Sequence, residues 1–292
     1  MLKKGEAMTE YSKKGYLYSN FKIFHLSDSN LGEIDFHYHD FHKVLIHLSG
    51  NTSYSIEGQT FDLQANDIVF VNAGEVHRPI FHDNSTYERI IIYISKEFLA
   101  EYSQTDNDLS YCFRNAIENG SHVLRLHSFK NSRVAATVGK LTSNLGKDDY
   151  ANELFMQVLF LEFMVELNRA AISNEVEYLS TSYSGSKINS IINYINENLT
   201  SDLSVDAIAG QFYLSRYYLM HTFKDETGYT IGNYITIKRL ALAQSLIDAG
   251  KPIADAAEQS GFGTYSTFLR AYKKTYGTSP KKKAASQASL SF

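Results

Sequence analysis

Two hydrophobic patterns divide the chain. From Tyr16 to about Lys96, apolar residues form short runs rich in β-branched and aromatic side chains, such as 44–46, 68–71 and 90–93. Turn-forming residues separate these runs at intervals of about ten residues, which predicts short strands of a β-sandwich or barrel. After Lys96 the pattern becomes helical, so the expected fold class is α+β.

The helical part opens with two predicted helices, 133–145 and 151–171. The second is apolar nearly all round and therefore needs burial on more than one side. It packs either within its own domain or between the barrel and a second subunit, and the sequence leaves both open. Residues 173–186 are polar without an apolar period, which indicates a linker, and a stripe from Ile188 to Ile195 then marks an amphipathic helix.

A chain of 292 residues is long enough for two hydrophobic cores. The patterns above predict a flexible tail at 1–15, a ligand-sensing barrel at 16–110, a helical connector or dimerisation segment at 111–172, the linker at 173–186, an all-α domain at 187–284 and a tail at 285–292.

The segment from Asp202 to Pro280 contains one short pattern twice. Matching positions lie 48 residues apart before the turn and 49 after it, so the second turn is one residue longer, at Gly263-Thr264. A short helix, a tight turn and a longer helix that ends at glycine form a helix-turn-helix motif. A continuous helix between the copies would hold the two longer helices apart, as successive major grooves about 34 Å apart require.

The outward faces of the two longer helices carry hydroxyls, cations and aromatic edges, which suit phosphates and base edges. One copy alone would fit an ordinary helical hairpin equally well, but the repetition favours DNA binding. The predicted DNA-contacting residues are Ser215, Arg216, Tyr217, Met220, His221 and Lys224 in the first copy, and Tyr265, Ser266, Thr267, Arg270 and Lys274 in the second.

At these residues the chain resembles the DNA-binding domain of the AraC/XylS family of transcription regulators. Ile208-Ala209, Phe223-Lys224 and Glu226-Thr227-Gly228 match the first motif of that family, and 261–280 matches the second. The chain departs from the family at 281–283, where three lysines follow Pro280. The resemblance implies double-stranded DNA as a partner, a homodimer formed through helices between the domains, and RNA polymerase as a further partner.

The barrel contains two segments, 37–43 and 66–77, that resemble the two cupin motifs found in sensor domains of the same family. His37 and His39 alternate with Tyr38, so they lie on one face of a strand. We expect a pocket for a small polar molecule with hydrogen bonds from His37, His39, Lys43, His77 and Arg78. Family members with this domain pair often sense sugars, so the resemblance implies a sugar effector.

Lys43 is the reason why we expect no metal ion at these histidines. It stands where metal-binding cupins have a glutamate, and an ammonium has no lone pair and repels a cation. We therefore predict no metal, no cofactor and no catalytic residue. Three alternatives stay open: the histidines are hydrogen-bonded core residues, the barrel is a metal-dependent enzyme fused to a DNA-binding domain, or the barrel only dimerises.

Charge and cysteine content complete the sequence-based description. From Lys187 onward there are 12 basic and 8 acidic residues, against 16 and 24 before it. This imbalance fits a C-terminal part that meets a polyanion, although so small an excess also arises by chance. With Cys112 alone, no disulfide can form within the chain, and the first ten residues lack the apolar segment of a signal peptide. We therefore expect a cytoplasmic regulator that makes no membrane contact.

Overall fold

The computed structural model describes residues 17, 19–104, 107–173, 175–181 and 187–280. The chain divides into two compact units, one up to Ser184 and one from Gly185. The tails predicted at 1–15 and 285–292, residues 182–186 of the predicted linker, and the lysines at 281–283 lie outside the described residues.

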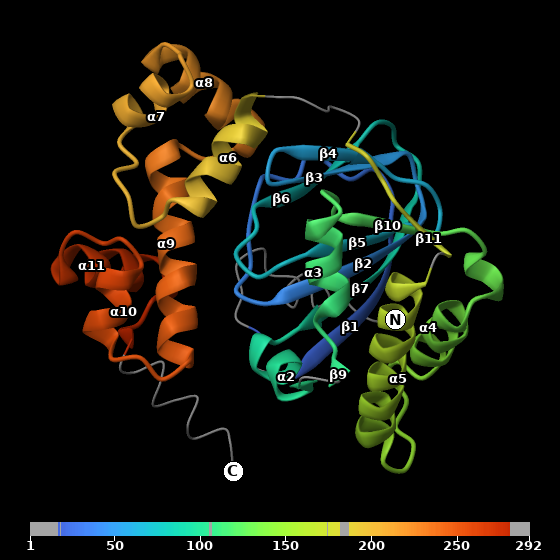
Figure 1. Cartoon of the computed structure of the whole chain (residues 1–292). Coiled ribbons are helices and arrows are strands. Elements are labelled where there is room, and N and C mark those ends of the chain that lie inside the picture. The colour runs from blue at the N-terminus through green and yellow to red at the C-terminus, as the bar shows by residue number, and fades with distance from the viewer. Residues whose placement is uncertain (1–16, 18, 105–106, 174, 182–186, 281–292) are drawn as a thin grey trace. The chain divides into compact units, whose positions relative to one another are not determined.

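Two antiparallel sheets and a small two-stranded pair form the strand framework of the N-terminal unit (Figure 1). The larger sheet has the strand order β1 (Phe21–Asp28), β7 (Tyr87–Ile94), β2 (His42–Ser49), β5 (Ile68–Val71), β10 (Val123–Leu126) and β11 (Val176–Tyr178). The smaller sheet has the order β4 (Gln59–Asp62), β3 (Thr52–Ile56) and β6 (His77–Phe81). The pair consists of β8 (Ser103–Gln104) and β9 (Asn107–Asp108).

Alternation along the central strands produces two hydrophobic cores. On β7, Ile90 and Ile92 pack toward the helices, while Ile91 and Tyr93 pack between the two sheets. The same alternation holds on β2 and β5. In a sheet that is buried on both faces, each strand is apolar at nearly every position. This explains why the sequence shows continuous apolar runs rather than strict alternation of apolar and polar residues.

The helices of this unit cover the larger sheet. They are α2 (Lys96–Glu101), α3 (Tyr111–Glu118), the 3₁₀ turn η1 (Phe129–Asn131), α4 (Arg133–Ser143) and α5 (Asn152–Ile172). Helix α5 buries one side, including Phe160, Phe163 and Leu167, in the core of its own unit. The part of the chain expected to be a separate connector therefore shares the hydrophobic core of the barrel.

Two short strands correct the predicted boundaries. Strand β10 lies inside the predicted helical segment, and β11 lies inside the predicted linker, where it pairs with β10. Leu179, also in the predicted linker, is buried. Strands of three or four residues are too short to show a period of two, so neither has a recognisable strand pattern in the sequence.

The C-terminal unit is entirely helical within the described residues. It consists of α6 (Lys187–Glu197), α7 (Val205–Gln211), α8 (Arg216–Thr227), α9 (Ile231–Asp248), α10 (Ile253–Gln259) and α11 (Tyr265–Tyr276). Helix α9 serves both halves: its Tyr234 ring meets Phe223 of α8, and further along, its Leu240 and Ala243 pack with Phe268 and Tyr272 of α11. The predicted continuous helix between the two copies is confirmed.

No helix among the described residues is long and apolar enough to cross a membrane.

Candidate functional site

The two helix-turn-helix motifs have the same construction. Helices α7 and α10 begin 48 residues apart, at 205 and 253, whereas α8 and α11 begin 49 apart, at 216 and 265. Both longer helices end at a glycine with positive φ, 73° at Gly228 and 69° at Gly277, whose N–H donates to a lysine carbonyl. The repeat offset, the longer second turn and both glycine ends are therefore as the sequence predicted.

Serine and threonine caps set the start of the two longer helices. The Ser215 side chain accepts a hydrogen bond from the Tyr218 N–H, and Thr264 accepts one from the Thr267 N–H. Each cap satisfies one of the N–H groups left unpaired at a helix start. Ser215 therefore has a structural role in addition to its predicted place at the DNA.

Every predicted DNA-contacting residue is exposed. In α8 and its cap these are Ser215, Arg216, Tyr217, Met220, His221 and Lys224, and in α11 they are Tyr265, Ser266, Thr267, Arg270 and Lys274. Tyr217 and His221 lie one helical turn apart, and their rings are in contact, with centroids 4.3 Å apart and planes tilted by 42°. Buried Leu219, Phe223, Phe268 and Tyr272 anchor the opposite faces, which fixes the orientation of the exposed ones.

Two details of this surface were not evident from the sequence. The Arg216 guanidinium pairs with Asp206 of α7 at 3.1 Å, so its charge is shared with a carboxylate. Tyr213, in the turn between α7 and α8, has φ 53° and is 95 % exposed. A non-glycine residue in the left-handed region is uncommon, and backbone dihedrals are not visible in a sequence.

Inside the N-terminal barrel, three histidines converge. His37 and His39 lie in an extended segment before β2, and His77 opens β6, to which His37 is joined by a β-bridge. One ring nitrogen from each lies within 4.8 Å of the others, and all three side chains are buried. The predicted common direction of His37 and His39 agrees with their ring-centroid distance of 5.1 Å.

Hydrogen bonds fix two of the three rings. Nδ1 of His37 donates to the Asp35 carbonyl and Nδ1 of His77 to the Glu75 carbonyl, each at 2.9 Å. Within the described part of the chain, Nε2 of His77 and both ring nitrogens of His39 are buried without a partner. Each such group costs about 1–3 kcal/mol if nothing binds it, so the cluster has the properties of a ligand site.

The imidazoles of His39 and His77 are held neutral. Burial, and then the positive charge of Lys43, lower the pKa of His39 and of His77 well below 6.5. Lys43 itself is buried, and its Nζ donates to the Tyr54 hydroxyl at 2.7 Å. Burial, and then the charge of Arg89, lower the pKa of Lys43 to about 7. Lys43 therefore lies near His39 and His77, whose pKa values its charge lowers.

Arg78 does not join this cluster. It follows His77 directly on β6, and successive strand residues point to opposite faces. Its guanidinium instead pairs with Glu33 at 2.6 Å and lies over the Phe36 ring, 4.2 Å from the centroid. The structure therefore does not bring Arg78 together with His77, contrary to the expectation from the sequence. Three aromatic residues lie beside the cluster and were not predicted from the sequence: Tyr54, Phe41 and Tyr93.

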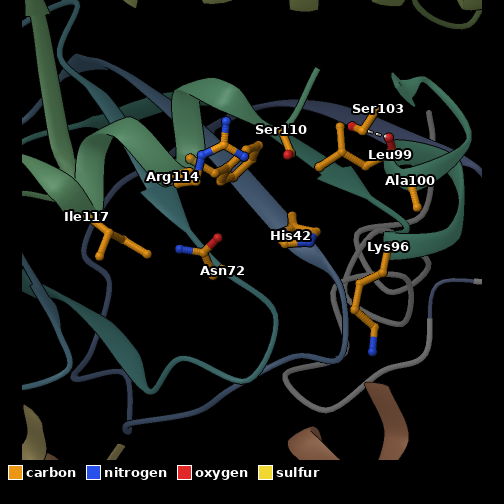
Figure 2. A pocket seen from close by; sticks show the side chains of 10 residues that line it. His42, Asn72, Lys96, Leu99, Ala100, Ser103, Ser110, Arg114 and Ile117 are labelled. Atoms are coloured by element: carbon orange, nitrogen blue, oxygen red, sulfur yellow. Dashed lines mark hydrogen bonds between the residues drawn. The ribbon is translucent and has the colours of Figure 1, made fainter. Parts of the chain in front are cut away.

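A cavity of about 430 Å³ is bounded by the start of β2, α2 and α3 (Figure 2). Figure 2 shows Arg114 and Asn72 on one side of His42 and Lys96 on the other. Arg114 pairs with Asp108 at 2.7 Å, and the Ser103 hydroxyl donates to the Leu99 carbonyl at 2.7 Å. Neighbours in the chain therefore occupy Arg114 and Ser103, whereas Nδ1 of His42 is buried without a hydrogen-bond partner among the described residues.

Part of α5 is apolar and exposed. Leu154, Val158 and Val165 repeat at spacings of four and seven, and Leu154 and Val158 are 63 % and 53 % exposed. The opposite side of the helix is buried in its own unit. The apolar character of α5 thus has two sources, a face buried in its own unit and an exposed face.

Family comparisons match both units. A family model described as an AraC-like ligand binding domain matches residues 28–164, and one described as a helix-turn-helix domain matches residues 198–285. The chain is 25 % identical over 263 residues to the HTH-type transcriptional activator RhaS of Shigella sonnei, covering 87 % of this chain and 89 % of RhaS. RhaS of Escherichia coli K12 is 24 % identical over the same length.

Two solved structures are also similar to this chain. ToxT from Vibrio cholerae O395 has 16 % identity and a TM-score of 0.37, and the match covers 90 % of this chain and 96 % of ToxT. The DNA-binding domain of AdpA, in complex with a target DNA, has 20 % identity and a TM-score of 0.34, covering 35 % of this chain and 93 % of that domain.

Proposed function

The chain belongs to the AraC family of transcription regulators, with a small-molecule-binding domain and a helix-turn-helix DNA-binding domain, and on that premise we propose that it activates transcription in response to a sugar bound inside the barrel. The observation that carries the proposal is the buried polar cluster of His37, His39, His77 and Lys43, enclosed by aromatic side chains. The RhaS relatives are named as activators, which supports the direction of regulation.

The composition of the cluster supports a sugar. Imidazole nitrogens and the Tyr54 hydroxyl can pair with hydroxyl groups, while Phe41 and Tyr93 offer apolar faces to a sugar ring. Among the described residues, no carboxylate joins the three histidines within the same 4.8 Å.

We further propose that α8 and α11 both read DNA. Arg270 would form two hydrogen bonds to a guanine edge, and Lys224 and Lys274 would contact phosphates. Tyr217 and His221 would present their paired rings to bases or sugars. The 18 residues of α9 span about 27 Å at 1.5 Å per residue, which supports simultaneous engagement of successive grooves.

The unpartnered face of α5 supports a homodimer. Leu154, Val158 and Val165 would pack against the same residues of a second copy, because a two-fold contact uses one patch on both subunits. Sugar binding would then favour one arrangement of the dimer and so change how the DNA-binding domains are presented. RNA polymerase is the further partner that activation requires.

Fluorescence anisotropy on labelled duplexes from upstream of its own and neighbouring genes tests this function. We expect specific binding that weakens steeply with salt and that one sugar of a panel shifts. Tyr54→Phe should lose the sugar response, whereas Tyr150→Phe, an exposed tyrosine outside the barrel, should keep it. A Tyr54→Phe protein that responds like the wild type would place the effector elsewhere, and absence of specific binding would overturn the regulator function for these promoters.

A further inference from the structure

Lys43 is a buried cation without a counter-ion. Its side chain is 1 % exposed, and its Nζ donates to the hydroxyl of Tyr54, on the smaller sheet, at 2.7 Å. Within the described part of the chain, Nζ has no carboxylate partner. A hydroxyl is neutral, so it leaves the charge of the ammonium uncompensated. A buried charge is costly unless a counter-ion pairs with it, and this cost is available to a ligand that brings one.

The charges that act around Lys43 are positive. Burial, and then the charge of Arg89, lower the pKa of Lys43, while burial, and then the charge of Lys43, lower the pKa of His39 and of His77. Among the residues that the structure describes, no carboxylate raises any of these three pKa values. Arg89 has a counter-ion of its own, Asp28, at 2.5 Å. The barrel interior therefore lacks a negative charge at Lys43.

Ring nitrogens near Lys43 are suited to hydroxyl groups. Nε2 of His77 and both ring nitrogens of His39 are buried without a hydrogen-bond partner among the described residues. A carbonyl oxygen only accepts, so Nδ1 of His77 carries the hydrogen that it donates to the Glu75 carbonyl, and Nε2 is left as an acceptor. A hydroxyl of a ligand can donate to this nitrogen. One cation together with these nitrogens fits a molecule that carries both a carboxylate and hydroxyl groups.

We propose that the effector is an acidic sugar of the uronate class, whose carboxylate pairs with Lys43 and whose hydroxyls pair with His39 and His77. This inference rests on the proposed function, in which a sugar binds inside the barrel, and it adds the charge of that sugar. A carboxylate carries one negative charge, which matches the single ammonium of Lys43, whereas a phosphate carries nearly two. The rings of Phe41 and Tyr93, next to His39, would contact the apolar side of the sugar.

Isothermal titration calorimetry on the full-length chain without DNA tests the charge of the effector. Glucose, galactose and mannose would each be compared with the corresponding uronate. We expect one uronate to bind at least about tenfold more tightly than its neutral sugar, because only the acid pairs with the buried ammonium. Lys43→Met should remove this preference, whereas Lys22→Met, at an exposed lysine of β1, should keep it.

A second comparison uses the wild-type chain alone, so it stays decisive if Lys43→Met folds poorly. The uronamide of the same sugar has nearly the shape of the uronate but no charge, and we expect it to bind at least about tenfold more weakly. Equal binding of uronate and uronamide would overturn the inference, as would a sugar 6-phosphate that binds more tightly than every uronate.

The neutral sugars separate this inference from the proposed function. If a neutral sugar binds and no uronate binds more tightly, the effector is a sugar, as proposed, but the assignment of its charge is wrong. If neither the sugars nor the uronates bind, both the sugar effector and its charge are overturned. Retention of the uronate preference in a folded Lys43→Met chain would assign the recognition of the carboxylate to another cation and contradict the role of Lys43.

Discussion

Gly261 lies against the carbonyl oxygen of Leu199: a Cβ at position 261 would sit 2.2 Å from that oxygen. The same oxygen accepts a hydrogen bond from Nε of Arg239 at 2.8 Å, and Arg239 also donates to the Ser201 carbonyl. The turn of the second helix-turn-helix motif, helix α9 and the segment that follows α6 therefore meet at one point. This contact joins the two halves of the DNA-binding unit.

Gly261→Ala should destabilise the DNA-binding unit. Gly261 has φ +86°, and the added methyl group would displace backbone, so we expect a loss of roughly 2–4 kcal/mol in the free energy of unfolding. Gly263→Ala, two residues away, meets nothing within 4 Å and should change stability little. Thermal unfolding of the two full-length variants would compare them, and equal melting temperatures would contradict the contact.

Arg270→Ala and Lys274→Ala should separate base reading from phosphate contact. Both residues are exposed on α11. Loss of a guanine contact should cost about 1–3 kcal/mol at one base position, whereas loss of a phosphate contact should weaken all sequences alike and lower the salt slope by about one. Anisotropy on a set of single-base operator variants distinguishes them. If Arg270→Ala weakens every duplex equally, the base-reading role is wrong.

His42 should make the N-terminal unit sensitive to mild acid. Burial, and then the charge of Lys96, lower the pKa of His42 from 6.5 to about 4. Between these two pH values the unfolded chain binds a proton that the folded chain does not, so stability falls as pH decreases from 6.5 to 4, by at most about 3 kcal/mol. Urea unfolding of the wild type and His42→Gln over this range should show a smaller acid loss in the variant. Parallel curves would exclude His42 as the source.

Val158→Glu should dissociate the proposed homodimer. A carboxylate at the centre of the apolar face of α5 would have to be desolvated twice in a two-fold contact. Ala136→Glu, at an exposed position of α4, is the matched control and should leave the assembly intact. Sedimentation equilibrium measures both. A wild-type chain that stays monomeric at micromolar concentration would contradict the dimer through α5.

Cys112 should report on unfolding of the N-terminal unit. It is the sole cysteine of the sequence and is buried in the core between the larger sheet and the helices. Burial raises the pKa of its thiol, so little of the reactive thiolate exists at neutral pH. We expect a thiol reagent to label it only after denaturant unfolds this unit. Rapid labelling of the native chain would show that the core around α3 opens readily.

The sequence by itself determined the features that depend on local spacing. The repeat offset of 48 and 49 residues placed both helix-turn-helix motifs, because helix length, turn length and the terminal glycine are all local properties. The exposed residues of α8 and α11 followed from the same reasoning, since buried Leu219 and Phe268 fix the opposite face. The barrel strands followed from apolar runs, although β10 and β11 were too short to be recognised.

Only the tertiary structure decided what depends on contacts between distant segments. His37 and His77 are joined by a β-bridge across 40 positions, and that pairing makes three separate histidines one cluster. The same pairing directs Arg78 away, to Glu33, although it is adjacent to His77 in the sequence. Local patterns show on which face of a strand a residue lies. The residues that this face contacts depend on strand pairing, which is set by the packing of the whole core.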